Sequence, residues 1–234
     1  DTGGIAPNVV QSYARVRYSI RANELDGMRE LIERVRKIAE GAALMTETRM
    51  EMKVISAVSN ILGNRPLEEA MQTMLEELGP PPFDEADRDF ARKIRATLTE
   101  QDLAAPWKVI GREPTDAPLA DFTVPLDQPR KLMIGSTDVG DVSWVVPTVQ
   151  AHAPSIAIGT PLHTWQVVAQ GKSPHAHKAM VHVAKAMAGT GVAVLTDPDL
   201  MARVKADHQA RTAKTPYVSP LPEGVNPPLD MSRG

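Results

Sequence analysis

Apolar and polar residues alternate along the stretch from Tyr13 to Arg21. The apolar side consists of Ala14, Val16, Tyr18 and Ile20, and the polar side of Arg15, Arg17, Ser19 and Arg21. A period of two residues is typical of a β-strand that buries one face. A shorter alternation at residues 50–55 predicts a second strand.

Between these two segments, apolar residues recur every three or four positions, which predicts a helix that ends near Gly41. Its apolar stripe is Leu25, Met28, Leu31, Ile32, Val35, Ile38, Ala39 and Ala42. The order strand, helix, strand is the arrangement of a small α/β sandwich, in which helices cover one face of a sheet. The pattern therefore predicts an α/β fold class.

Further helices are predicted from the same periodicity and from capping residues. One covers residues 67–78 and stops at Gly79 and the three prolines that follow it. Three others begin at short polar N-cap residues, two of which precede a proline at the first helical position. These N-caps are Asp84, Ser173 and Asp197. We expect the helix after Ser173 to end near Gly189.

The remaining segments are rich in proline or in β-branched residues. Residues 104–131 are expected to form an irregular connection, and residues 214–234 an extended tail on the surface. Short buried strands with breaks are predicted within residues 142–158. The proline run after Gly79 divides the chain into a first domain at 1–79 and a second at 80–234.

Composition excludes several classes of protein. The 234 residues carry 26 Lys and Arg against 29 Asp and Glu, for a net charge of −3, and aromatic residues make up 4%. Nucleic-acid binding is not indicated, because it usually needs a basic surface and stacking aromatic residues. There are no cysteines, so a metal would need His, Asp or Glu ligands.

No apolar run approaches the roughly 20 residues of a membrane span, and no signal peptide is apparent. A membrane is therefore not expected as a partner, and the compartment stays open, with the cytoplasm favoured.

The tripeptide Asp1-Thr2-Gly3 has the sequence found in aspartic proteases. That chemistry needs two carboxylates that share one proton, and the chain has no second copy of the tripeptide. A glycine-rich turn is the favoured interpretation.

His163 is the histidine best placed for chemistry, because it follows the last predicted strand by a few residues. Ligands of α/β sheets gather at the carboxyl ends of strands. The alternative is an ordinary loop histidine. Joint chelation of a metal by His175 and His177 is not expected, because residues two apart on a helix point about 200° apart. His182 and His208 are explained by positions that face the core or the solvent.

Two other places have residues suited to substrate binding. Asp138 lies in the small-residue segment 135–141, which is either a tight loop near a substrate or a capped turn. Arg21 ends the first predicted strand on its polar side, 13 residues after Asn8. An arginine fork suits a carboxylate, although a solvated surface arginine is the default.

Several motifs resemble the di-zinc aminoacylase and glutamate carboxypeptidase family of amidohydrolases, in particular its branch that acts on p-aminobenzoyl-glutamate. They are GGIAPNVV at 3–10, YSIRA at 18–22, GSTDVGDVSW at 135–144, HTW at 163–165 and AHK at 176–178. The resemblance extends over most of residues 3–210, with the motifs in the family's order.

This resemblance implies a chain that starts within a small α/β lid domain, which also dimerises, and continues into the carboxyl-terminal part of a larger α/β zinc-hydrolase domain. It implies two divalent metal ions, zinc first and manganese as the alternative. Asn8 and Arg21 match positions that grip the substrate's carboxylate, Asp138 matches a position beside the substrate, and His163 matches the last histidine ligand of a metal.

The family's other metal ligands and its general base have no counterpart in this sequence. We therefore expect another chain or segment to supply them, together with a homo-oligomer formed through the lid. The expected reaction is metal-dependent hydrolysis of the amide bond of an N-acyl or N-aroyl amino acid of the p-aminobenzoyl-glutamate kind. The alternative is a noncatalytic binding or assembly subunit that retains the fold.

Overall fold

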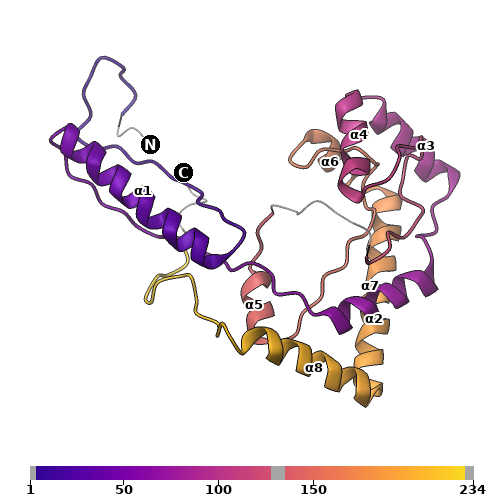
Figure 1. Ribbon diagram of the computed structural model, residues 1–234. Helices are drawn as coiled ribbons and strands as arrows, with labels where there is room; N and C mark the ends of the chain where they lie inside the picture. Colours follow the sequence, from indigo (N-terminus) through magenta and orange to yellow (C-terminus); the bar gives the residue numbers. More distant parts are fainter. Residues whose placement is uncertain (1–3, 128–134, 230–234) are drawn as a thin grey trace. The chain divides into compact units, whose positions relative to one another are not determined.

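The computed structural model describes residues 4–127 and 135–229, and their regular structure is α-helical (Figure 1). The helices are α1 (Leu25–Met45), α2 (Arg65–Leu78), α3 (Glu85–Arg95), α4 (Glu100–Ile110), α5 (Val139–Val145), α6 (Trp165–Gln170), α7 (Pro174–Thr196) and α8 (Pro198–Thr212). Asp1-Thr2-Gly3, the end of the predicted connection and the last five residues of the predicted tail lie outside the described residues.

The predicted α/β fold class is wrong, both for the α/β lid and for the α/β hydrolase domain, because the described residues contain no strand. Residues 13–21 and 50–55 instead run back along the length of α1 without forming a sheet (Figure 1). Val16 and Tyr18, expected on a buried face, are 69% and 75% exposed. The physical reason is that a strand needs hydrogen bonds from a neighbouring strand. The alternation of apolar and polar residues predicts which face of a strand would be buried, but it supplies no neighbouring strand to pair with.

The short buried strands predicted within residues 142–158 are also wrong. The first residues of this range belong to α5, and residues 146–158 have no helix or strand. Val142, Val145 and Val146 are exposed. A run of β-branched residues therefore identifies apolar side chains here but does not decide between helix and strand, as is common for short apolar runs.

Helix starts are predicted more accurately, because they depend on a few neighbouring residues. Asp84 forms a capping box with Asp87, in which each side chain accepts a hydrogen bond from the other residue's backbone N–H at 3.0 Å. The side chains of Ser173 and Asp197 cap α7 and α8 as predicted. Gly79 ends α2 at φ 66°, a left-handed conformation that favours glycine.

One helix extends beyond its prediction, and one helix was not predicted. α7 continues past Gly189 and Gly191 to Thr196, since an isolated glycine costs only about 1 kcal/mol relative to alanine and packing offsets it. The expected irregular connection is helical up to Ile110, where α4 ends. Thr99 caps α4 through a capping box with Asp102, and the helix includes Pro106.

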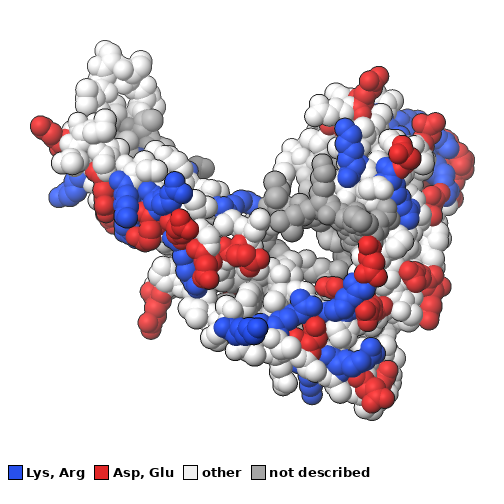
Figure 2. Space-filling view, viewed as in Figure 1, with Lys and Arg blue, Asp and Glu red and all other residues white. Residues whose placement is uncertain are grey.

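The chain divides into two compact units, residues 1–60 with 218–234 and residues 61–217. The predicted boundary at Gly79 lies after α2, which belongs to the second unit. In the first unit, α1 has no fully buried residue, and its apolar stripe is partly buried, with Ile38 70% exposed. Acidic and basic side chains are interspersed over α1 in Figure 2, where Asp26 pairs with Arg29 at 3.1 Å and Glu33 with Arg36 at 3.4 Å.

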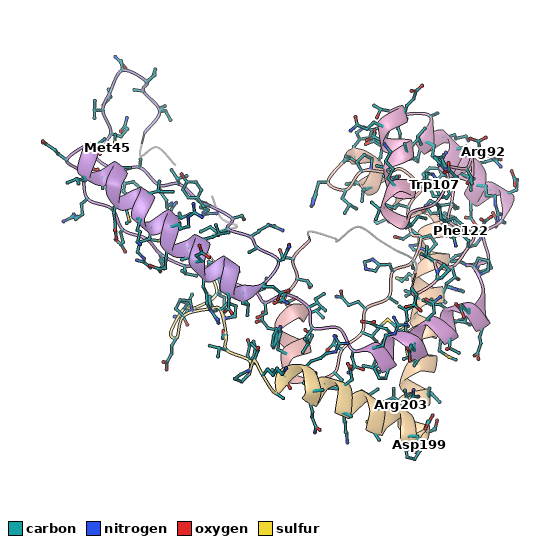
Figure 3. The ribbon with its side chains drawn as sticks, viewed as in Figure 1. Met45, Arg92, Trp107, Phe122, Asp199 and Arg203 are labelled. Carbon is teal, nitrogen blue, oxygen red and sulfur yellow. The ribbon has the colours of Figure 1, made fainter. Side chains whose placement is uncertain are left out.

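The second unit contains the buried residues. α2, α7 and α8 pack on one another, and their shared cluster includes Leu67, Leu200 and Val204. A second cluster joins α3 and α7 to the loops and consists of Phe83, Ala91, Ile94, Leu119, Ala157 and Ala179. Trp107 of α4 is 2% exposed and lies next to Phe122, with ring centroids 5.8 Å apart (Figure 3).

α7 is long and apolar enough to cross a membrane, although only 17% of its most apolar window is buried. Length and composition alone are weak evidence for a span, since core helices of soluble proteins also meet this test. The described structure therefore shows a helix with much exposed apolar surface, which the sequence pattern did not predict.

Candidate functional site

His163 lies in the loop between Ala157 and α6, and its side chain is exposed. Its φ of 63° is in the left-handed region, which among the described non-glycine residues only Glu47 shares. This conformation costs an L-residue about 1–2 kcal/mol and persists only where surrounding contacts enforce it. Such residues are enriched at functional sites, so the backbone gives His163 physical support that the predicted strand no longer provides.

The loop that carries His163 is held by the side chain of Gln170, which is fully buried. Its Oε1 atom accepts a hydrogen bond from the backbone N–H of Ala157 at 2.7 Å. Its Nε2 group donates to Oγ1 of Thr160 at 3.1 Å and to the carbonyl of Gln166 at 3.0 Å. The Thr160 hydroxyl donates in turn to the carbonyl of Ala157 at 2.7 Å.

The base of the loop rests on α3, α4 and the segment between α4 and α5. Arg95 donates to the carbonyl of Ile158 at 3.1 Å, and the N–H of Ile158 donates to the carbonyl of Pro118 at 2.9 Å. Gly159 has φ 97°, and a Cβ there would lie 3.1 Å from the Cα of Leu103. Glycine is therefore required both by the backbone conformation and by the close approach to α4.

A separate cluster surrounds His175 in the first turn of α7. His175 is fully buried, lies 3.1 Å from Oγ of Ser173, and packs beside Phe90 with ring centroids 5.7 Å apart. Lys178 forms ion pairs with Asp84 at 2.7 Å and Asp87 at 2.5 Å. These ion pairs lower the pKa of Asp84 and raise that of Lys178. The cluster joins α3 to α7 through buried and paired groups, so a structural role fits it.

Burial lowers the pKa of His175, an effect that outweighs the opposing influence of Asp87. The unfolded chain then binds a proton more readily than the folded chain, so stability is lost as the pH falls below about 6.5. We expect the free energy of unfolding, measured by urea titration, to decrease between pH 7.5 and 5.5. His175→Phe should remove most of this decrease, whereas an unchanged pH dependence in that variant would assign it to other groups.

Asp138 precedes α5 and is exposed, at the N-cap position but without a capping hydrogen bond. Oγ1 of Thr137 lies 3.4 Å from its carboxylate. The next residue, Val139, lines an apolar groove of about 690 Å³ together with Leu67, Met71 and Leu195. The structure thus places the Asp138 loop beside this apolar groove.

Asn8 and Arg21 lie in the first unit and are exposed. Asp138 and His163 lie in the second unit. Asn8 and Arg21 thus share one unit, and Asp138 and His163 share the other. The predicted roles of these four residues stay predictions.

The donor set of the described residues does not by itself fit a pair of metal ions. No three His, Asp or Glu side chains within residues 4–127 and 135–229 gather in a way that could hold a metal. The imidazole of His163 is a suitable zinc ligand, but one donor does not make a site. Further ligands would have to come from outside the described residues.

Comparison with known proteins gives two relatives. The chain is 43% identical to a subunit of the p-aminobenzoyl-glutamate hydrolase of Escherichia coli, over 97% of this chain and 50% of that protein. It is 24% identical to the human Xaa-Arg dipeptidase, over 93% of this chain and 40% of that protein. The chain thus spans about half the length of the curated relatives it matches. No family model and no solved structure matches it.

Proposed function

We propose that this chain is part of a hydrolase that cleaves the amide bond of an N-acyl or N-aroyl amino acid, with p-aminobenzoyl-glutamate as the model substrate. The observation that carries the proposal is the 43% identity to the p-aminobenzoyl-glutamate hydrolase of Escherichia coli along 97% of this chain. Both relatives are named as enzymes that hydrolyse an amide bond to an amino acid. The proposal accordingly assigns this chain to the di-zinc family of amidohydrolases.

In this proposal the chain supplies two parts of the active site. His163 contributes one nitrogen ligand to a metal ion, zinc or manganese, whose other ligands lie on a companion segment with the general base. Asn8 and Arg21 bind the substrate's free carboxylate, and Asp138 borders the substrate. The exposure of all four side chains supports these roles, because each is accessible to a ligand.

The companion segment is supported by the apolar surface of the second unit. Leu195 is 81% exposed and Met187 is 58% exposed, and both line the groove beside α2. Full burial of such a side chain contributes about 1.5–3 kcal/mol. Half of the Escherichia coli relative lies outside the match, and in this proposal part of that half covers the groove.

Self-association through the first unit is a further part of the proposal. Ile38, Leu44 and Met45 of α1 are exposed, so the helix offers apolar contacts to a second copy. A homodimer that buries them would stabilise a helix that has no buried residue of its own.

Arg21→Ala is expected to reduce kcat/KM for p-aminobenzoyl-glutamate by roughly 10- to 100-fold, because a charge-assisted contact contributes about 1.5–3 kcal/mol. Stability should hardly change, since Arg21 is exposed. Rates are measured on the free acid and on a substrate whose α-carboxylate is amidated. The wild type should strongly prefer the acid, and Arg21→Ala should process both about equally poorly. A variant that keeps the wild-type preference would show that the carboxylate is held elsewhere.

The alternative, a noncatalytic binding or assembly subunit, is favoured by one observation, the absence of a metal-binding group among the described residues. Calorimetry with p-aminobenzoyl-glutamate and chromatography of the same samples separate the two functions. Release of p-aminobenzoate by the protein expressed from its complete coding sequence supports the hydrolase. Binding without product supports the alternative.

A further inference from the structure

We infer that Gln170 is a positioning residue, which holds the loop carrying His163 in the conformation that hydrolysis requires. The inference rests on the proposed function of His163. Gln170 itself is fully buried and is not expected to touch the substrate.

The hydrogen bonds of Gln170 are directed at this loop. Of its three side-chain bonds, one goes to the carbonyl of Gln166 in its own helix and two go to Ala157 and Thr160. The Thr160 hydroxyl closes the network by donating to Ala157. A buried amide whose donors and acceptor are all bonded fixes its partners, because leaving one unsatisfied costs about 1–3 kcal/mol.

The loop needs such a restraint at His163. Residues 157–164 form no helix or strand, and φ at His163 is 63°. After Thr160, the Thr164 hydroxyl donates a hydrogen bond to the carbonyl of Pro161 at 2.8 Å. Loss of the Gln170 network would allow His163 to relax toward the negative φ values that L-residues prefer. The imidazole would then point elsewhere while the loop base stayed anchored by Arg95.

Asn64 provides a matched control in the same unit. It is also a buried amide, 1% exposed, and its side chain donates to the carbonyl of Val204 at 2.9 Å and accepts from Leu67 at 3.2 Å. These bonds join α2 to α8 rather than holding a loop. Removing the Asn64 amide should therefore reduce stability through the loss of buried hydrogen bonds, without moving His163.

The test uses the protein expressed from its complete coding sequence, with p-aminobenzoyl-glutamate as substrate. Gln170→Met keeps the shape of the side chain and removes its hydrogen bonds, and Thr160→Val does the same for the hydroxyl. Both should lower kcat by roughly 10- to 100-fold, the cost of misplacing a catalytic group by about 1 Å, with KM within about threefold. Thr160→Ser should restore kcat because it keeps the hydroxyl. Hydrogen exchange at the Ala157 amide should accelerate in Gln170→Met, and Asn64→Leu should lower Tm but leave kcat unchanged.

Two results would overturn the inference, and His163→Ala in the same assay separates them. If Gln170→Met and Thr160→Val keep the wild-type kcat while His163→Ala loses it, the positioning role is wrong and the proposed function stands. If His163→Ala itself keeps the wild-type kcat, the role of His163 is wrong and that of Gln170 falls with it. Should Gln170→Met fail to fold, the Thr160→Val and Thr160→Ser pair decides between the same outcomes.

Discussion

Replacing His163 by Ala is expected to remove most of the bound metal and to abolish nearly all hydrolysis. Groups that only hydrogen-bond to a metal ligand already contribute 10- to 100-fold to metal affinity, so loss of the ligand should cost more than roughly 100-fold. The folded chain should tolerate the change, because the His163 side chain is exposed. The backbone at this position has φ 63°, which strains any L-residue. Alanine should therefore be about as stable there as histidine.

The measurement is metal content by mass spectrometry together with kcat for p-aminobenzoyl-glutamate on the same sample. His177→Ala is the control, since His177 is exposed in the first turn of α7 and carries no assigned role. It should retain both metal and rate. Unchanged metal content and rate in His163→Ala would return His163 to an ordinary loop histidine.

The 234-residue polypeptide expressed alone is expected to show neither cooperative unfolding of both units nor hydrolysis. Its first unit has a helix without a buried residue, its second unit exposes much of α7, and no described group of side chains can hold a metal. Apolar surface of this extent normally marks an interface or causes aggregation.

Coexpression with a segment that corresponds to the unmatched half of the Escherichia coli relative should restore both properties. Urea unfolding followed by circular dichroism reports the folding, and release of p-aminobenzoate reports the activity. Metal-dependent turnover by the isolated polypeptide, with metal measured on that sample, would refute the need for a companion segment.

Sequence alone predicted the helices well where local chemistry determines them. Asp84, Ser173 and Asp197 were recognisable as N-caps because capping needs only residues within one turn. The strands predicted at 13–21 and 50–55 do not form in the described residues, because a strand needs a hydrogen-bonded neighbour that the alternating pattern does not reveal. α4 was missed because the prolines of its region outweighed the capping box at Thr99, which was visible in the sequence.

The candidate site was partly predictable. His163 was singled out from a predicted strand that the structure does not contain, so its present support is the resemblance and its left-handed backbone. Gln170 could not have been found, because its role depends on burial and on bonds to Ala157 and Thr160 that folding creates. The sequence pattern places His175 in the first turn of a helix, whereas its burial next to Phe90, which lowers its pKa, is apparent only from the structure.

Metal titration of the stripped protein tests the central claim most directly. The protein from the complete coding sequence is freed of metal with a chelator, and zinc or manganese is added back stepwise while release of p-aminobenzoate is followed. We expect hydrolysis to be absent without metal, to rise to a plateau near two metal ions per chain, and to be lost throughout in His163→Ala. Full hydrolysis by the metal-free protein, or a titration that His163→Ala leaves unchanged, would contradict the account.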